Sequence, residues 1–335
     1  CEAADVRRYL KEFLWDPRVV EIPRPIWWFV LNMVILNTRP KRSAKAYKKV
    51  WTEEGSPLLT ISRQQAETLQ AALDESHADK FKVVLAMRYG NPSIRDGLEK
   101  LRQAGARRVL VFPLYPQYSA STTASTFDAV TAELQHWRWI PELRFINHYH
   151  DDANYIEALA KSIQDFWRDR GKPEKLIMSF HGIPKDYLLK GDPYHCECHK
   201  TGRLLAEKLQ LSDEQWQLTF QSRLGPKEWL RPYTDQTLEA LGKEGIKNVQ
   251  VVCPGFSADC LETLEEIAME NRETFLNAGG EQYEYIPCLN SRDSHIDMML
   301  KLVERHTSGW NLAKSAEQVT EEARLRNERA NKMKA

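Results

Sequence analysis

Short runs of β-branched and aromatic residues recur along this chain, and most of them are separated from the next by a helical pattern. The runs lie at residues 81–89, 107–115, 143–149, 175–181, 215–222, 248–256 and 283–289. Amphipathic patterns between them include residues 93–106 and 155–171. Because the runs are almost continuously apolar, they predict strands that are buried on both faces. The alternation of strand and helix therefore predicts an α/β fold with parallel sheets flanked by helices.

Two stretches of the chain match each other at a fixed offset of 140 residues. The matching pairs are Leu98 and Leu238, Glu99 and Glu239, Leu101 and Leu241, Gly105 and Gly245, Val109 and Val249, and Val111 and Val251. A helix that ends at glycine before a strand is common in α/β proteins, so the match also has a generic explanation. As a repeat, it predicts two similar Rossmann-like domains with a cleft between them, at residues 1–155 and 156–310. A polar tail follows at residues 311–335.

The two predicted halves begin differently. The second half opens with a strand at residues 175–184, whereas the first half opens directly in a helical pattern at residues 4–14. We therefore expect that a first strand is missing from the supplied chain. A parallel sheet without a central strand would expose backbone groups and lose a large apolar contact, which predicts a less stable protein.

Charge and cysteine content exclude several classes of function. Lys+Arg and Asp+Glu both number 47, so no overall field favours nucleic acid as a partner. Six cysteines spread unevenly over 335 residues do not form the framework of a disulfide-rich protein and favour a reducing, cytoplasmic compartment. Cys1 leaves a processed lipoprotein as the alternative, although no signal sequence precedes it.

The most apolar segment is "IWWFVLNMVIL" at residues 26–36. It is too short to span a membrane, which needs about 20 apolar residues. A buried core helix is one interpretation of it. Paired tryptophans beside basic flanks are also typical of a segment that lies at a membrane interface.

Residues at the carboxyl ends of the predicted strands are the candidates for a site, because ligands bind there in parallel α/β sheets. Neither a G-x-G-x-x-G turn after a strand nor a G-x-x-x-x-G-K-[ST] loop is present, which argues against nucleotide cofactors. His181 ends one predicted strand. Glu262, Glu266 and Glu270 recur every four residues on a helix that follows another strand, with Asp259 just before it. The row is either a solvated helix face or a path for protons or a divalent cation.

The sequence "HCECH" at residues 195–199 places Cys196 and Cys198 between two histidines. It lacks the C-x2-C spacing and the second pair that a structural zinc site requires. Cys253, Cys260 and Cys288 could complete a metal or iron–sulfur site only if the fold brought them close. The alternative is a surface loop with reduced thiols.

Taken together, these motifs resemble the ferrochelatase family, and the bacterial protoporphyrin branch in particular. The resemblance runs in order from about Val6 to about His306. It is carried by "EEGSPLL" at 53–59, "MRYGNPS" at 87–93, "LYPQYSASTT" at 114–123, "SFHGIP" at 179–184, "TFQSRLGPKEWL" at 219–230 and "CPGFSADCLETLEEI" at 253–267.

The resemblance implies an enzyme, a lyase that inserts Fe²⁺ into protoporphyrin IX in the terminal step of haem synthesis. It implies that His181 and Glu262 face each other across the porphyrin, one accepting pyrrole protons and the other handling the metal. Asp259, Glu266 and Glu270 match the family's proton or metal path. The porphyrin-binding positions that it implies are Arg88, Tyr89, Trp229 and Phe256 around the macrocycle, and Arg39, Tyr47 and Ser56 at the propionates.

The resemblance also suggests a role for residues 26–36, as a hydrophobic lip that rests on the membrane and admits the porphyrin. The implied lip residues are Ile26, Trp27, Trp28, Phe29 and Leu31. A cytoplasmic protein bound peripherally to the inner membrane follows, with protoporphyrin IX, Fe²⁺ and the membrane surface as partners. The preceding protoporphyrinogen oxidase is a further candidate partner, whereas nucleic acid is not.

The chain departs from the family in two ways. Members begin with a strand that ends in an N-L-G-T-P-like loop, and this chain starts after it, as a truncated copy or an incomplete record. Some members carry a [2Fe-2S] cluster whose ligands usually include a C-terminal cysteine set, which this chain lacks. We therefore expect that no cofactor is required. Cys196 and Cys198 remain the candidate ligands if a [2Fe-2S] cluster is present. The alternatives are a non-catalytic porphyrin or haem carrier, a truncated inactive chelatase, and a related chelatase acting on another tetrapyrrole.

Overall fold

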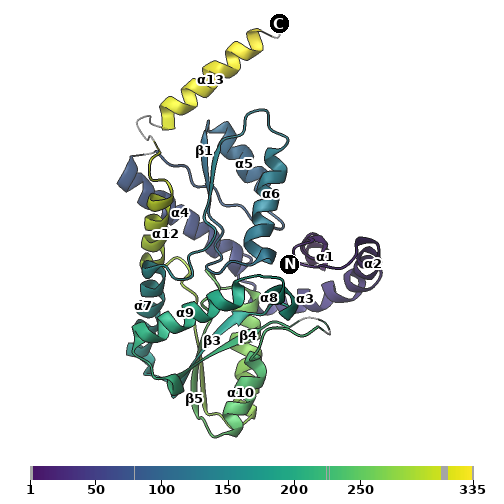
Figure 1. The fold of residues 1–335 in the computed structure, drawn as a ribbon, viewed down its shortest axis with the longest axis vertical. Coiled ribbons are helices and arrows are strands. Elements are labelled where there is room, and N and C mark those ends of the chain that lie inside the picture. The colour runs from purple at the N-terminus through teal and green to yellow at the C-terminus, as the bar shows by residue number, and fades with distance from the viewer. Residues whose placement is uncertain (1–2, 79, 224, 226, 311–315, 334–335) are drawn as a thin grey trace.

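The computed structural model describes residues 3–78, 80–223, 225, 227–310 and 316–333. Six strands form two parallel sheets (Figure 1). The strands are β1 Arg108–Val111, β2 Glu142–Phe145, β3 Lys175–His181, β4 Trp216–Gln221, β5 Asn248–Val252 and β6 Gln282–Ile286. β1 pairs with β2, and the larger sheet has the order β4-β3-β5-β6. The predicted α/β fold with parallel sheets flanked by helices is confirmed.

Helices connect and cover these strands. The α-helices are α1 Ala3–Trp15, α2 Arg24–Phe29, α3 Leu36–Val50, α4 Pro57–His77, α5 Ile94–Gln103, α6 Ser125–Leu134, α7 Ala153–Arg170, α8 Lys185–Leu189, α9 Tyr194–Leu209, α10 Thr234–Lys243, α11 Arg272–Asn277, α12 Asp293–His306 and α13 Ala316–Lys332. Three π-helical stretches are η1 Val30–Ile35, η2 Ala120–Ala124 and η4 Glu262–Asn271, and η3 Asp213–Gln215 is a 3₁₀ turn.

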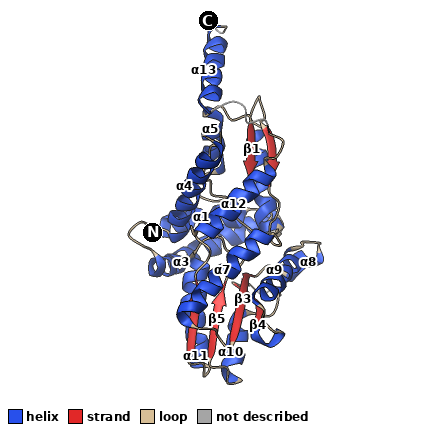
Figure 2. Cartoon of the chain, turned by 90° about the vertical axis from the view of Figure 1, so that its left-hand side faces the viewer, coloured by secondary structure: helices blue, strands red, loops and turns tan. Residues whose placement is uncertain are grey.

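The larger sheet is buried on both faces because its side chains alternate along each strand. Leu176, Met178 and Phe180 of β3 join the core that α7, α9 and α12 cover. Ile177, between them, points into a second core under α10 and α11. Figure 2 shows the helices on the two sides of this sheet. Near-continuous apolar sequence in these strands follows directly from this two-sided burial.

The 140-residue repeat is visible in the order of the elements. α5 and α10 begin at residues 94 and 234, β1 and β5 at 108 and 248, β2 and β6 at 142 and 282, and α7 and α12 at 153 and 293. Four elements in the same order at one offset exceed what a single helix-glycine-strand unit would produce, although the helices between the two strands of each pair do not keep that offset. The division into units at 1–155 and 156–310 stays a prediction.

The predicted strand at residues 81–89 is wrong. Residues 81–86 run without regular secondary structure and form no ladder with another described segment. They correspond to β4, which lies 135 residues later and pairs only with β3. In the smaller sheet the position equivalent to β3 holds no described strand, so residues 81–86 have no neighbour to supply ladder hydrogen bonds.

The first three helices form a helical hairpin beside the main body (Figure 1). α2, η1 and α3 follow one another without a break, and their inner face packs on α1 through a small apolar core of its own. Trp27 donates its indole N–H to the carbonyl of Leu14 at 2.6 Å, which fixes the hairpin. No helix among the described residues is both long and apolar enough to cross a membrane.

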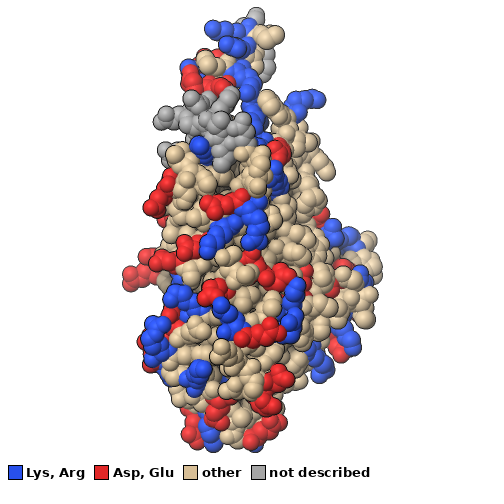
Figure 3. Space-filling model, turned by 60° about the vertical axis from the view of Figure 1, so that its left-hand side comes forward, with Lys and Arg blue, Asp and Glu red and all other residues tan. Residues whose placement is uncertain are grey.

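The polar tail contributes α13, whose described side chains are mostly exposed, as expected for a surface helix. Residues 311–315 and 334–335 of the predicted tail lie outside the described residues. Figure 3 shows positive and negative side chains interspersed over one face of the molecule. This mixture agrees with the balanced charge of the sequence.

Candidate active site

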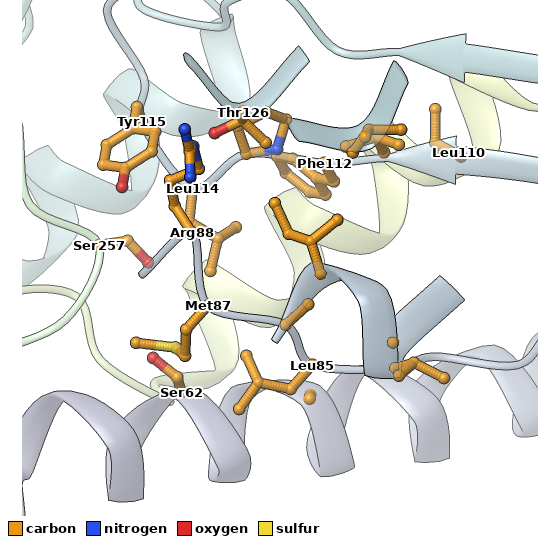
Figure 4. A pocket seen from close by; sticks show the side chains of 18 of the residues that line it. Ser62, Leu85, Met87, Arg88, Leu110, Phe112, Leu114, Tyr115, Thr126 and Ser257 are labelled. Carbon is orange, nitrogen blue, oxygen red and sulfur yellow. The ribbon is translucent and has the colours of Figure 1, made fainter. Parts of the chain in front are cut away.

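One large cavity, of about 1710 Å³, opens at the carboxyl ends of the strands. His181 and Glu262 both line it, as do Arg88, Trp229 and Phe256. Its volume exceeds the usual range for small ligands, roughly 300–1,000 Å³, because it continues into the space between residues 81–86 and β1. Figure 4 shows that part of the wall, with Leu85 and Met87 facing Leu110 and Phe112 and with Ser62 of α4 beneath.

His181 reaches the cavity because it is the last residue of β3. Its Nδ1 lies 2.6 Å from the carbonyl oxygen of Gly182, a contact in which Nδ1 donates. The other ring nitrogen, Nε2, is then the one with a free lone pair. Gly182 also donates its N–H to the carbonyl of Gln221 at 2.7 Å, and a Cβ there would lie 2.8 Å from that oxygen. Glycine is therefore required by the close approach of β4.

Glu262 opens η4, the next element after β5, and residues 253–261 connect the two. Gln221, at the end of β4, donates its side-chain amide to the backbone carbonyl of Glu262 at 3.0 Å. The amide oxygen of Gln221 accepts a bond from Ser179 of β3 at 2.9 Å. A single buried glutamine thus fixes the start of η4 against two strands. Stretches of π-helix are rare and are often found at functional sites.

Glu266 lies one turn further along η4 and is half-buried. Its carboxylate accepts the backbone N–H of Ser222 at 2.7 Å and a short bond from the Ser222 hydroxyl. Ser222 adopts φ +66°, a left-handed conformation that is uncommon for serine. Burial raises the pKa of Glu266 above its usual range. The hydrogen bonds from Ser222 and the attraction of His181 lower the pKa, but they offset only part of this effect. A carboxyl group in this state holds a proton more readily than an exposed one.

Glu270 is the next member of the row. Its pKa is raised, mainly by partial desolvation and to a smaller extent by repulsion from Glu265. Glu265 is itself paired with Lys49 of α3, with Nζ and Oε1 2.7 Å apart. This ion pair connects the helical hairpin to η4. Glu262 and Glu266 are half-buried, whereas Glu270 is exposed, and of the three only Glu262 lines the cavity. The row is therefore solvated at its far end and not along its whole length.

Asp259 stands apart from this row. Its side chain is buried and accepts hydrogen bonds from the Thr263 hydroxyl at 3.1 Å, the Asn290 amide at 2.7 Å and the Tyr285 hydroxyl. Asp259 is not among the residues that line the cavity. In this structure it anchors the loop before η4.

Arg88 and Tyr89 follow residues 81–86 and line the cavity wall. Both bind the buried carboxylate of Asp16, Arg88 through a short ion pair and Tyr89 through its hydroxyl at 2.8 Å. The Arg88 guanidinium also lies 4.5 Å from the centre of the Tyr89 ring. Phe256 lies beside His181, with ring centroids 6.4 Å apart.

Three predicted porphyrin-binding residues lie outside the cavity lining. These are Arg39, Tyr47 and Ser56. Tyr47 is nevertheless close to the site, since burial and the nearby charge of Glu262 raise its pKa. Burial also raises the pKa of Tyr9, followed by the effects of Tyr47 and of Glu262. The charge of Glu262 therefore acts on both tyrosines.

The structure corrects the membership of the predicted lip. Ile26, Trp28 and Phe29 are 61%, 51% and 60% exposed, whereas Trp27 and Leu31 are buried in the hairpin core. Helical periodicity places residues 27 and 31 on the same inward face. Met33 and Val34, which the prediction omitted, are also exposed. We call the exposed set of Ile26, Trp28, Phe29, Met33 and Val34 the apolar lip.

The alternative interpretation of residues 195–199 as a surface loop is wrong, because "HCECH" lies at the start of α9. The preceding Asp192 accepts the N–H of Tyr194, the first residue of this helix, at 3.0 Å. Cys196 is exposed and Cys198 is buried, since residues two apart on a helix point to nearly opposite sides. Among the described residues, no cluster of three potential metal ligands contains a cysteine.

Sequence reasoning missed three residues that position this site, Asp16, Gln221 and Ser222. Gln221 and Ser222 stand at a predicted strand end, so the strand-end rule found their location without their roles. Asp16 gave no usable signal, because an aspartate before proline is typical of an ordinary turn.

The family model described as Ferrochelatase matches residues 2–307. A ferrochelatase from Thioalkalivibrio sulfidiphilus is 62% identical over 305 residues, covering 91% of this chain and 83% of that protein. One from Marinobacter nauticus is 56% identical over 325 residues, covering 97% and 88%.

Among solved structures, SirB from Bacillus subtilis with Fe³⁺ aligns with a TM-score of 0.51 at 15% identity, over 73% of this chain and 90% of that one. This likeness concerns the fold alone. The family match and the sequence identities establish more than the fold. The chain belongs to the ferrochelatase family.

Proposed function

We propose that the cavity is where this ferrochelatase, a lyase, inserts Fe²⁺ into protoporphyrin IX, with His181 and Glu262 as its catalytic residues. The observation that carries the proposal is that both side chains line one cavity from adjacent parallel strands. His181 ends β3 and Glu262 follows β5, and these two strands are paired. The metal is a substrate and leaves in the product.

The reaction exchanges one Fe²⁺ ion for two pyrrole N–H protons, so the site must accept protons and admit a cation. Nε2 of His181 is available as a proton acceptor because Nδ1 donates to the carbonyl of Gly182. Glu262, with Glu266 and Glu270 behind it, supplies oxygen ligands that hold Fe²⁺ only transiently. The raised pKa values of Glu266 and Glu270 suit carboxyl groups that carry protons away.

The macrocycle is flat and largely apolar, and the cavity wall matches it. Arg88, Tyr89, Trp229 and Phe256 line the cavity and are proposed to contact the ring. Arg39, Tyr47 and Ser56 are proposed to meet the propionates where the ring reaches beyond the lining. Asp259 contributes to the metal and proton path through the position of η4.

The proposal is tested by mixing the protein anaerobically with Fe²⁺ and detergent-solubilised protoporphyrin IX and following the loss of porphyrin fluorescence. We expect multiple turnovers, with two protons released per porphyrin consumed. A porphyrin carrier would instead quench fluorescence once, in proportion to protein, without releasing protons. Single-equivalent quenching at every Fe²⁺ concentration would contradict the proposed activity.

We propose that the apolar lip rests on the cytoplasmic face of the inner membrane and collects porphyrin there, from the preceding protoporphyrinogen oxidase. A porphyrin dissolved in lipid is best captured by an apolar patch that inserts shallowly. The ion pair of Lys49 with Glu265 connects the hairpin that carries the lip to the acidic row. This ion pair therefore keeps the segment proposed to admit the porphyrin next to the helix that carries Glu262.

Replacing Trp28 and Phe29 together with serine is expected to weaken binding to lipid vesicles by about 100-fold or more, since each buried aromatic contributes about 1.5–3 kcal/mol. Co-sedimentation with vesicles measures the change. The matched control replaces Trp139 and Ile140, which are equally exposed at 56% but lie in another part of the chain. Equal losses in the two double variants would show non-specific adsorption rather than a lip.

A [2Fe-2S] cluster is not part of the proposed mechanism, because exchange of Fe²⁺ for protons needs no electron transfer. Burial raises the pKa of the Cys198 thiol, which disfavours the thiolate form that ligates iron.

A further inference from the structure

Two histidines and a glutamate meet outside the cavity, where the chain leaving β2 contacts α9. His148 and His150 follow β2, and Glu197 lies in the first turn of α9. Nδ1 of His148 is 2.7 Å from one carboxylate oxygen of Glu197, and Nδ1 of His150 is 3.2 Å from the other. One ligand atom from each residue lies within 4.8 Å of the others. None of the three residues lines the cavity.

His150 of this cluster is a buried histidine with a ring nitrogen left unsatisfied by the described residues. Its side chain is only 7% exposed, yet its Nδ1 makes no hydrogen bond with any described residue. The atom is near the Glu197 carboxylate but is not aligned with it for a hydrogen bond. Its other nitrogen, Nε2, lies 3.9 Å from a carboxylate oxygen of Asp151. A histidine that binds a metal through one ring nitrogen typically has a carboxylate near its other ring nitrogen. For His150, Nδ1 would bind the ion and Nε2 would face Asp151.

We propose that His148, His150 and Glu197 bind a resident divalent transition-metal ion, for which Zn²⁺ is the best match. Two imidazoles and one carboxylate form a donor set that zinc and its neighbours in the first transition series prefer. Ligand atoms around a tetrahedral zinc ion lie about 3.3 Å apart. The His150–Glu197 distance of 3.2 Å matches this spacing, whereas the 2.7 Å between His148 and Glu197 would have to lengthen when an ion binds. His148 is half-exposed, so solvent reaches the fourth position.

An ion at this point would join three segments of the chain. Glu197 also accepts the backbone N–H of Tyr118 at 2.6 Å, from the loop between β1 and η2. The Thr201 hydroxyl, one turn further along α9, donates to the carbonyl of His150 at 2.8 Å and accepts from Gln117 at 3.0 Å. Gln117 lines the cavity. The ion would therefore fasten a loop that borders the porphyrin cavity, without entering the cavity itself.

The test uses metal-stripped, porphyrin-free protein. Titration with Zn²⁺ by equilibrium dialysis is expected to give one tight ion per chain, and Co²⁺ is expected to give the visible absorption of a tetrahedral site. His148→Ala removes a half-exposed ligand without opening the core. It should weaken Zn²⁺ binding by more than about 100-fold, since losing even an outer-shell partner of a metal ligand costs about 10- to 100-fold.

The matched control is His195→Ala combined with His199→Ala. These two histidines lie on the same helix, with ring centroids 4.4 Å apart, and form the alternative chelating pair. The control and His181→Ala should both retain the ion. Unchanged affinity in His148→Ala, or loss of the ion in either control, would overturn the proposal. Because no porphyrin is present, the outcome is independent of the chelatase assay.

Discussion

His181→Ala and Glu262→Gln are each expected to lower the turnover number for iron insertion by about 10²- to 10⁴-fold, the range for loss of a positioned acid–base group. The alanine removes the free Nε2 at the end of β3, and the glutamine keeps the shape of Glu262 but cannot hold a proton. Porphyrin binding should persist in both variants, because the aromatic wall of the cavity is unchanged. Anaerobic turnover and porphyrin fluorescence titration measure the two quantities separately.

His136→Ala and Glu273→Gln serve as the matched controls. Both residues are exposed, and neither lines the cavity. They should leave turnover within about twofold, as expected for surface substitutions. Full activity in His181→Ala or in Glu262→Gln would remove that residue from the catalytic pair.

The positions of the strands in the larger sheet could be anticipated from sequence because each strand is apolar on both faces. The run at 175–181 became β3 at those same residues. The equally apolar run at 81–89 did not form a strand, because strand formation depends on a neighbouring backbone as well as on side chains. The apolar composition of a run indicates that it is buried. Whether the run forms a strand depends also on which backbone lies next to it in the folded protein.

The site shows the same limit at the level of side chains. Strand ends and the four-residue spacing located His181, Glu262 and Glu266, since both are local patterns. The bonds that fix them come from elsewhere in the chain, such as Gln221 on the carbonyl of Glu262. In the lip, apolar composition alone could not separate the buried Trp27 from the exposed Trp28. That separation needs the helix phase and the packing partner together.

Asp16→Asn is expected to lower the free energy of unfolding by about 3 kcal/mol, the lower end of the cost of breaking a buried ion pair. The Asp16 carboxylate is buried and accepts bonds from Arg88, the Tyr89 hydroxyl and the Ser125 hydroxyl. An asparagine keeps the size but leaves the Arg88 guanidinium, only 22% exposed, without its countercharge. Urea denaturation followed by tryptophan fluorescence measures the change.

Asp128→Asn is the control, because Asp128 forms the other kind of arginine pair. Its carboxylate lies 2.8 Å from Nε of Arg18, and both side chains are 45% exposed. Exposed ion pairs contribute about 0–1 kcal/mol to stability. Asp128→Asn should therefore lower the free energy of unfolding by at most about a third of the loss expected for Asp16→Asn. Equal losses in the two variants would mean that burial does not govern the Asp16 pair. A larger loss in Asp16→Asn, together with weaker porphyrin binding, would place Asp16 as the residue that holds Arg88 and Tyr89 in the cavity wall.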